Sequence, residues 1–223
     1  MSIGYGTRTV IDNSVLHIDA ANAKSWDGSL IKDLSNPALS LGSTSGALVV
    51  EDGAFNFTDS YAGGISVNNE NYNSQLYDFT MECLCSPSGT HSHYDGALLS
   101  SGNWNNTHWS FSLLQNNLGI RTRNPSFTYD YSFVVGNWYH IVYVRRGTTC
   151  YFIVNGEKSQ EFTQTSFIPL SSGASNTTVG RETYASGYFN FNGKIALAKI
   201  YDKALSDNQI AQNFEAYRGR YEL

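Results

Sequence analysis

Short runs in which apolar residues alternate with other residues recur along the chain, and this pattern predicts β-strands. The clearest early run is 77–85, where the apolar positions share one parity: Phe79, Met81, Cys83 and Cys85. A period of two places these side chains on one face, which we expect to point toward a core. Similar runs recur about every ten residues, the spacing of an antiparallel β-sandwich. They cover residues 15–18, 47–50, 54–57, 97–99, 109–114, 118–123, 127–134, 179–181 and 193–201.

The strongest hairpin signal lies between residues 138 and 156. Two runs of β-branched and aromatic residues flank Arg146-Gly147, and Asn155-Gly156 supplies a second turn that suits a positive φ. Residues 157–162 are then expected to pair back. The adjacent Arg145 and Arg146 fall at the end of a strand, where we expect a solvated turn.

Residues 206–218 give the one convincing helical pattern of the sequence. Ser206 suits the N-cap, and Gln209 three positions later completes a capping box. Apolar residues then recur at i, i+4 and i+7 and form one stripe that we expect to be buried: Ile210, Phe214 and Tyr217. Gly219 is the expected C-terminal stop. A stripe this narrow predicts a helix that covers one end or edge of the sandwich as part of the fold.

The length of 223 residues fits one all-β domain, and no linker-like stretch divides the chain. We therefore expect a single domain over residues 1–223. Charged residues make up only 15% of the chain, and it contains 15 Tyr and 20 Gly. Disordered chains have high charge and few aromatic residues, so this composition argues against disorder. Such a composition favours a large core with glycine turns.

The net charge of −5 argues against a nucleic-acid partner, because phosphate binding needs clustered Lys and Arg. No apolar run is long enough to cross a bilayer, so we expect no membrane insertion. The opening residues MSIGYGTRTVIDNS lack the charged and then apolar build of a signal peptide. The three cysteines are an odd number and fit a protein made in a cytoplasm, since secreted domains normally pair theirs.

Several stretches carry a resemblance to a known family. Residues 15–26 (VLHIDAANAKSW) and 33–36 (DLSN, without the family's glycine) open the chain, and 79–87 (FTMECLCSP) gives a central strand. The family's hairpin is matched by residues 137–144 (NWYHIVYV) and 154–156 (VNG). Together they resemble the concanavalin A-like, laminin G-like jelly rolls. The closing stretch 204–221, with QNF and GRY, resembles more narrowly the versions of this domain in structural proteins of tailed bacteriophages, of cyanophage type.

The resemblance covers nearly the whole chain. It implies an all-β, antiparallel β-sandwich, a concanavalin A-like jelly roll, with one short C-terminal helix. It also implies a non-enzymatic virion protein, made in the host cytoplasm, that decorates the capsid or tail in many copies and contacts other virion proteins. Two alternatives stay open, because fold does not decide function. One is a carbohydrate-binding adhesin domain that contacts host surface glycans, and the other is a glycan hydrolase.

Catalytic residues are not predicted. A glycanase of this superfamily would carry the pattern Glu-x-Asp-x-Glu on one strand, because retaining hydrolysis needs two carboxyl groups about 5 Å apart. No such triplet occurs, and Glu82 stands alone on its strand. No nucleophile-elbow sequence is present either.

A metal or other cofactor is not expected. Cys83, Cys85, His91 and His93 are the residue types of a zinc site. However, both cysteines share the parity of the apolar core positions, and buried cysteine behaves as a small apolar residue. Asp59 or Asp95 could serve a calcium ion at a sandwich rim, but calcium takes six or more oxygens and no Asp cluster is visible.

The candidate ligand- or partner-binding residues lie in three segments rich in aromatic and amide groups. They are His91, His93 and Tyr94; Asn103, Trp104 and Asn105; and Tyr184 and Tyr188. Aromatic planes and amide groups bind sugars, and they also favour protein interfaces. Trp104 is either exposed for a ligand or folded back onto the sheet edge. Tyr129 and Tyr131 are expected on the outward face of one strand.

Overall fold

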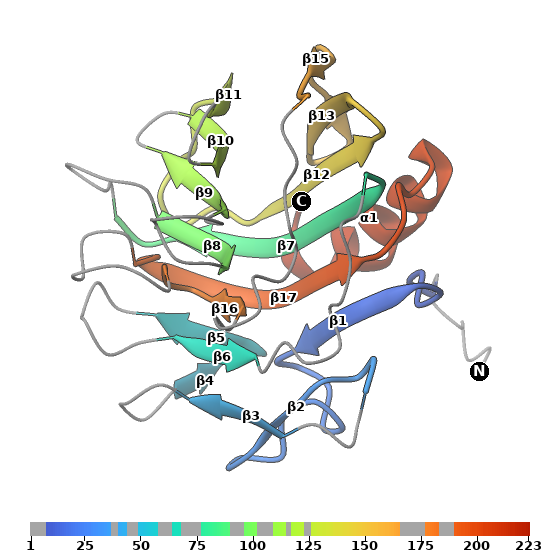
Figure 1. The fold of residues 1–223 in the computed structure, drawn as a ribbon. Helices are drawn as coiled ribbons and strands as arrows, with labels where there is room; N and C mark the ends of the chain where they lie inside the picture. Colours follow the sequence, from blue (N-terminus) through green and yellow to red (C-terminus); the bar gives the residue numbers. More distant parts are fainter. Residues whose placement is uncertain are drawn as a thin grey trace, which may run out of the picture.

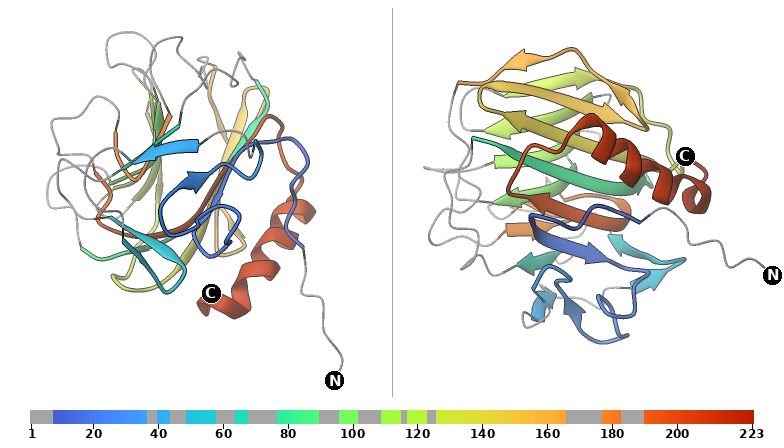
Figure 2. Two further views of the ribbon diagram at one scale, coloured as in Figure 1. Left: turned by 90° about the horizontal axis from the view of Figure 1, so that it is seen from below. Right: turned by 90° about the vertical axis from the view of Figure 1, so that its right-hand side faces the viewer.

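The computed structural model describes residues 8–36, 40–43, 49–57, 64–67, 77–89, 96–101, 109–114, 117–122, 126–165, 177–182 and 190–223. Within these ranges two antiparallel sheets stack face to face, and one helix lies against the outer side of one sheet (Figure 1). Figure 2 shows the two layers and the helix lying across its sheet. The predicted all-β sandwich with one C-terminal helix is confirmed in the described part of the chain.

The sheet that carries the helix, here called the helix-side sheet, has nine strands. Its centre is β7 (Phe79–Pro87), flanked by β12 (Tyr139–Arg146) and β17 (Gly193–Tyr201). The other strands are β1 (Ser14–Asp19), β4 (Val49–Glu51), β5 (Ala54–Phe57), β13 (Thr149–Val154), β14 (Glu157–Lys158) and β15 (Phe162–Thr163). All nine residues of β7 are buried, because one face of the strand meets the core and the other meets the helix.

The second sheet, here called the opposite sheet, has eight strands. One half consists of β8 (Gly96–Ser101), β9 (Trp109–Leu114), β10 (Asn117–Thr122) and β11 (Phe127–Asp130). The other half consists of β16 (Thr177–Val179), β6 (Ile65–Val67), β3 (Ser40–Ser43) and β2 (Ile31–Lys32). β11 is an edge strand, since it pairs with β10 and with no other strand of the described ranges. Of the strand predicted over 47–50, residues 47 and 48 lie outside the described residues.

The predicted hairpin is confirmed as β12 and β13, and β14 and β15 pair back onto β13 as expected. The expectation for Arg145 is wrong. Its side chain is fully buried, and its Nε donates a hydrogen bond to the carbonyl of Gly147 at 2.8 Å. Strand alternation turns Arg145 inward at the end of the hairpin, where carbonyl groups need a donor, and only Arg146 is exposed.

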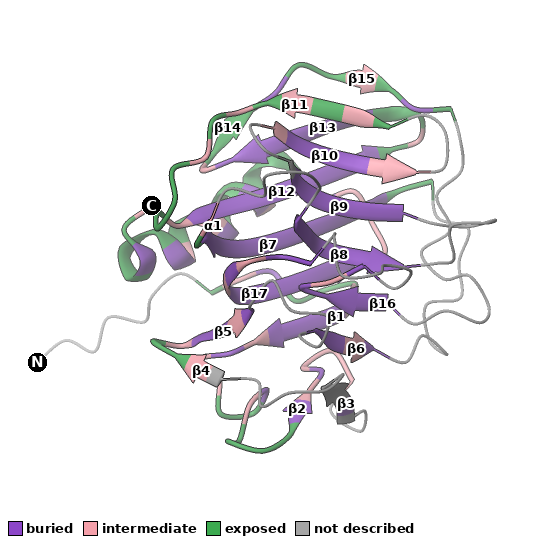
Figure 3. Cartoon of the chain, turned by 90° about the vertical axis from the view of Figure 1, so that its left-hand side faces the viewer, coloured by how far each residue is buried: buried purple, intermediate pink, exposed green. Residues whose placement is uncertain are grey.

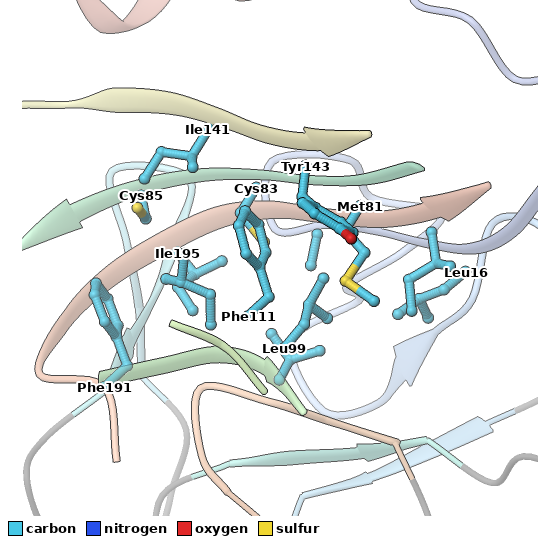
Figure 4. Packing of buried hydrophobic residues seen from close by; sticks show 14 of the residues in the cluster. Leu16, Met81, Cys83, Cys85, Leu99, Phe111, Ile141, Tyr143, Phe191 and Ile195 are labelled. Atoms are coloured by element: carbon cyan, nitrogen blue, oxygen red, sulfur yellow. The ribbon is translucent and has the colours of Figure 1, made fainter. Parts of the chain in front are cut away.

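Apolar side chains fill the space between the sheets, and Figure 4 shows part of this core. Cys83 and Cys85 face it next to Met81, as their parity predicts. Burial raises the pKa of both thiols, and all three cysteines are free. Both residues therefore act as small apolar core residues. Among the described residues, no group of three or more His, Cys, Asp or Glu side chains could hold a metal ion.

The strand predicted over 127–134 is shorter, because β11 ends at Asp130. Tyr129 and Tyr131 were expected to face outward, but both pack against the core. The ring of Tyr131 meets the ring of Tyr139 edge-on at 6.0 Å. The core at the edge of a sandwich has no further strand to cover it, so inward aromatic rings close it instead.

Helix α1 (Asp207–Tyr221) begins as predicted, with Ser206 as N-cap. The amide of Gln209 donates to Ser206 Oγ at 3.3 Å, and the amide of Ser206 donates to the Gln209 side chain at 3.0 Å, which completes the capping box. The predicted end at 218 is wrong. The helix continues past Gly219 because Tyr221 still packs on the sheet, 4.7 Å from the Trp138 ring, and it ends at Glu222 with φ 52°.

The buried face of α1 also differs from the expected stripe. Ile210 and Tyr217 are buried, but Phe214 is only half-buried and lies 5.9 Å from the His140 ring. The fully buried position is Asn213, one residue earlier. The reason lies in the sheet beneath, which carries polar side chains that an apolar residue could not pair. In the described ranges no helix is long and apolar enough to cross a membrane.

Candidate functional site

The first candidate region is a polar layer buried between α1 and the helix-side sheet. It consists of Glu82, His140, Lys199, Tyr201, Asn213 and Tyr217. Two apolar clusters flank this layer, one around Ile210 near the start of the helix and one around Tyr221 near its end. The helix therefore rests on apolar contacts at both ends and on polar contacts at its centre.

The carboxylate of Glu82 is the centre of the polar layer. It accepts hydrogen bonds from Tyr201 Oη at 2.9 Å and Asn213 Nδ2 at 2.8 Å, and it lies 2.8 Å from His140 Nε2. Burial alone would raise the pKa of Glu82, but the charge of Lys199 and these hydrogen bonds outweigh it and lower the pKa to about 2. Glu82 is therefore an ionised, fully paired group.

Lys199 and His17 adjoin this carboxylate. Lys199 Nζ donates a hydrogen bond to Tyr217 Oη at 3.0 Å. Burial lowers the pKa of Lys199, while the charges of Glu82 and Asp19 oppose that shift. Burial and the charge of Lys199 lower the pKa of His17 to about 3, against the pull of Glu82. His17 is consequently neutral at pH 7.

The polar layer is closed to ligands, because Glu82 is 1% exposed and His140 is 0% exposed. Glu82 stands alone on β7, as predicted, but Lys199 lies directly opposite it in the register with β17. Sequence reasoning missed this layer. The polar residues at positions 82, 140 and 199, which lie inside mostly apolar strands, could have revealed it. The arrangement positions α1 on the sheet.

The second candidate region is an open cleft at the edge of the sandwich, where β11 faces the segment that joins β14 to β15. It has a volume of about 590 Å³ and is here called the edge cleft. Its lining consists of Phe127, Thr128, Tyr129, Asp130, Phe152, Ser159, Gln160, Glu161 and Phe162. Figure 3 shows β11, β14 and β15 at the same end of the molecule, with exposed and half-buried residues.

Aromatic rings form the walls of the edge cleft. Phe127 and Phe162 are half-buried and stack on each other at 4.7 Å and 21°. Tyr129 is also half-buried and lies parallel to the buried Phe152, at 6.4 Å and 13°. Because the half-buried rings retain exposed surface, the edge cleft offers apolar ring surface to a ligand.

Polar groups surround these rings. The carboxylates of Asp130 and Glu161 and the amide of Gln160 lie at exposed positions in the lining. Ser159 contributes less, because its hydroxyl accepts a hydrogen bond from the Phe152 amide at 2.9 Å and donates one to the Gln160 carbonyl at 2.9 Å. The second edge of β11 has no partner strand in the described part, so alternate backbone groups also face this side.

The eight predicted site residues all lie outside the described residues: His91, His93, Tyr94, Asn103, Trp104, Asn105, Tyr184 and Tyr188. The same holds for the calcium candidates Asp59 and Asp95. The three predicted segments nevertheless attach to neighbouring strands of the opposite sheet. Segment 90–95 precedes β8, and segment 102–108 joins β8 to β9. Segment 183–189 is followed by Asn190, which bridges to Ala97 of β8.

A row of small hydroxyl residues crosses the outer face of these strands, and sequence reasoning missed it. In register, Ser110 of β9 lies beside Ser100 of β8, which lies beside Thr178 of β16. The hydroxyls of Ser100 and Thr178 are 3.0 Å apart, and both donate to the Arg181 carbonyl, at 2.9 and 2.7 Å. These groups are buried and already paired, so we do not assign them a ligand. The two serines of residues 109–112 (WSFS), which fall on one face of the strand, could have revealed this row from the sequence.

Comparison with known proteins defines the class of this fold. Residues 59–211 match the family model described as the concanavalin A-like lectin/glucanases superfamily. The match covers more than half of the chain, and the protein belongs to this superfamily. A search of curated protein sequences found no match.

Several solved structures share the fold at low sequence identity. The binding domain of Paraclostridial Mosquitocidal Protein 1 has a TM-score of 0.71 at 18% identity, over 92% of this chain and 52% of its own. A Trypanosoma rangeli sialidase in complex with sialic acid has a TM-score of 0.69 at 13% identity, over 99% of this chain and 35% of its own. This chain thus spans about half of the first protein and about a third of the second.

A third structure matches over nearly its whole length. Domain 4 of AbnA, a GH43 extracellular arabinanase from Geobacillus stearothermophilus, was solved in complex with arabinotriose. Its TM-score is 0.60 at 13% identity, over 92% of this chain and 98% of its own. At these identities the likenesses establish the concanavalin A-like fold.

Proposed function

We propose that the protein is a non-catalytic carbohydrate-binding domain and that the edge cleft is a saccharide site. The observation that carries the proposal is the meeting of aromatic ring surface with carboxylate and amide groups in one open cleft. A sugar can lay its apolar ring face on an aromatic side chain while its hydroxyls bind polar groups at the rim. The complex of AbnA domain 4 with arabinotriose supports a saccharide role for this fold.

Two observations favour binding over hydrolysis. The buried Glu82 and His140 cannot contact a substrate, because α1 covers them. Hydrolysis also needs a carboxylic acid kept protonated by its surroundings. Asp130 and Glu161 lie at exposed positions, and Glu161 is ion-paired with Lys158 at 3.0 Å. These are groups suited to accept hydrogen bonds from sugar hydroxyls.

The proposal is tested by screening the protein on an array of glycans that includes arabinotriose and measuring hits by calorimetry. The double variant Gln160→Ala/Glu161→Ala removes two exposed rim groups and should weaken binding by about tenfold or more. Glu215→Ala, on the exposed face of α1, is the matched control and should bind as the wild type does. A wild-type protein that binds nothing, or rim variants with unchanged affinity, would contradict the proposal.

The candidates predicted from the sequence enter the same experiment. The variant Trp104→Ala tests whether the saccharide binds to the segments attached to the opposite sheet instead of the edge cleft. If Trp104→Ala abolishes binding while Gln160→Ala/Glu161→Ala does not, the site lies on those segments and the edge cleft is not the binding site.

A virion role remains the second candidate, supported by the closing motif of the sequence. Asn213, Tyr217 and Tyr221 of that motif are buried against the sheet, so these residues have a use within the fold itself. A multi-copy domain of a tailed phage, made in the host cytoplasm and carried on the virion, could combine contacts to other virion proteins with contacts to host glycans. This role predicts a fixed copy number in purified particles, and absence from such particles would contradict it.

A further inference from the structure

We propose that the edge cleft is part of a longer site that takes a linear, extended oligosaccharide rather than a single terminal sugar. This inference rests on the proposed saccharide role of the cleft and names the class of its ligand. It follows from a line of aromatic rings that runs along β11 and continues past the lining of the cleft. This line is here called the aromatic row and consists of Phe127, Tyr129, Tyr131 and Phe133.

The rings of the aromatic row occupy alternate positions of one segment. Each of them is half-buried, whereas the residues between them are exposed: Thr128, Asp130 and Ser132. A period of two places the rings on one side of the chain, and this alternation continues beyond the end of β11 at Asp130. At a rise of about 3.3 Å per residue, an extended segment over 127–133 spans about 20 Å. The aromatic row is therefore longer than a disaccharide.

Ring contacts show that the aromatic row continues outside the edge cleft. Of its members, Phe127 and Tyr129 line the cleft. The ring centroids of Tyr129 and Tyr131 are 6.1 Å apart, and those of Tyr131 and Phe133 are 4.8 Å apart. Tyr131 and Phe133 thus extend the half-buried ring surface of the cleft by two further positions.

A buried tyrosine holds the far part of the aromatic row in place. The ring of Tyr139 meets the rings of Tyr131 and Phe133 edge-on, at 6.0 and 4.9 Å. The hydroxyl of Tyr139 accepts a hydrogen bond from the Val134 amide at 2.7 Å, which fixes the backbone directly after the row. Side chains that are already ordered lose little conformational entropy when a ligand binds. This part of the row is therefore prepared for a ligand before it arrives.

The edge of the helix-side sheet runs beside the aromatic row. Phe162 stacks on Phe127 at one end, with 4.7 Å between the ring centroids. Glu157 lies opposite Val154 in the register of β14 with β13, and Val154 belongs to the core, so the Glu157 side chain is on the face of the sheet that looks toward the row. Burial and nearby titratable groups, Glu157 among them, raise the pKa of Tyr131.

The segment from Glu157 to Phe162 therefore runs antiparallel to the aromatic row, and Figure 3 shows β14, β15 and β11 at this end of the molecule. The exposed Gln160 and Glu161 lie between the two ends of this segment. The site consequently has rings along one side and hydrogen-bonding groups along the other. A sugar chain needs this arrangement repeated along its length, because each unit carries both an apolar face and hydroxyl groups.

A straight row of rings favours a straight sugar chain. Cello-oligosaccharides are extended chains of glucose whose flat faces follow one another, whereas malto-oligosaccharides contain the same sugar in a curved chain. Each further unit of an extended chain can stack on a further ring of the aromatic row. A curved chain leaves the row after its first contacts, so the two series differ in shape and not in the groups that they offer.

The test measures affinity against chain length by calorimetry. The affinity of the wild-type protein should rise about tenfold or more from cellobiose to cellotetraose, because further rings are engaged. Maltotetraose should gain little over maltose. The same length series is measured for any other linear glycan that binds on the glycan array.

The outcomes separate this inference from the proposed function. Affinities that do not rise with chain length, or array hits confined to short terminal sugars, would overturn the inference and leave the saccharide role standing. An equal rise in the cello and malto series would also overturn it, since a straight row would then have no part in recognition. If neither series binds and the array is empty, the saccharide role fails and the inference fails with it.

Variants outside the lining of the edge cleft locate the effect in the aromatic row. Tyr131→Leu removes one ring but keeps an apolar side chain, and it should lower the affinity for cellotetraose about tenfold while cellobiose binds as before. Tyr131→Phe keeps the ring and should keep the affinity. Ser132→Ala, at the exposed neighbouring position, is the matched control and should alter neither ligand. An unchanged ratio of the two affinities in Tyr131→Leu would overturn the inference.

Discussion

The side-chain amide of Asn213 joins the two ends of the chain to the centre of the helix-side sheet. Its Nδ2 donates a hydrogen bond to the buried Glu82 carboxylate at 2.8 Å, and its Oδ1 accepts one from the Val10 amide at 2.7 Å. One residue of the C-terminal helix therefore satisfies both a buried anion and the N-terminal segment. Docking of α1 and ordering of residues near Val10 should accordingly be coupled.

Replacing this residue tests the coupling. Asn213→Ala leaves a buried carboxylate short of a donor and a backbone amide short of an acceptor, so we expect a loss of about 3 kcal/mol in the free energy of unfolding. Asn208→Ala, at an exposed position on the same helix, should change it by about 0.5 kcal/mol or less. Urea denaturation measures both. Equal stabilities of the two variants would show that the polar layer does not hold the helix.

The two adjacent arginines of the β12–β13 hairpin give a second, internally matched prediction. Arg145 is buried and donates to the Gly147 carbonyl, whereas Arg146 is exposed. Arg145→Ala should destabilise the protein by about 3 kcal/mol because it leaves buried carbonyl groups unpaired, and Arg146→Ala should cost about 0.5 kcal/mol or less. Thermal and urea unfolding of the pair would decide this. If both substitutions were nearly neutral, the burial of Arg145 would not matter to stability.

The burial of His17 should make the free energy of unfolding fall in acid. Its pKa lies at about 3 in the fold, against 6.5 for a free histidine, so below pH 6.5 the unfolded chain takes up a proton that the folded chain excludes. The stability from this neutral histidine is complete above pH 6.5 and is lost as the pH falls toward 3. Each pH unit in that window should remove about 1.4 kcal/mol.

The variant His17→Gln isolates the contribution of His17 to the pH dependence of the free energy of unfolding. The stability advantage of the wild type over the variant should shrink by about 1.4 kcal/mol per pH unit between about pH 6 and pH 5. The carboxyl of Glu82 does not titrate in that range, because its pKa is lowered to about 2. Unfolding free energies at several pH values give the comparison. Parallel curves for the two proteins would exclude His17 as the titrating group.

The three cysteines provide a probe of the core. Cys83, Cys85 and Cys150 are free and buried, and burial raises the pKa of each thiol. We expect none of them to react with an aromatic disulfide reagent until the protein unfolds, because the thiolate is the reactive form. The reaction rate should rise with urea in parallel with unfolding. A thiol that reacts at once in native buffer would place that cysteine outside the core.

The sequence predicted those features that depend on local patterns. Alternation placed Cys83 and Cys85 in the core, positive-φ turns marked the β12–β13 hairpin, and Ser206 with Gln209 marked the start of α1. Each of these signals is contained in a few neighbouring residues. The resemblance to laminin G-like jelly rolls then supplied the sandwich architecture with one C-terminal helix.

What could not be predicted depends on contacts between distant segments. Asn213 rather than Phe214 faces the sheet because of Glu82, which lies 131 residues earlier. Tyr129 and Tyr131 turn inward because β11 is an edge strand, and periodicity does not reveal which strand forms an edge. The edge cleft exists only because β11 and residues 159–162 come together in the fold. The eight predicted site residues remain predictions, since they lie outside the described residues.

A residue-resolved NMR titration of the labelled protein with lactose and with arabinotriose tests the saccharide site most directly. A sugar bound in the edge cleft should cause saturable shifts of the backbone amides of Thr128 and Asp130 on β11 and of Gln160 and Glu161 across the cleft. Residues of the polar layer beneath α1 should keep their positions in the spectrum. Unchanged amides around the edge cleft, or shifts confined to segments 90–95, 102–108 and 183–189, would contradict the assignment of this cleft as the saccharide site.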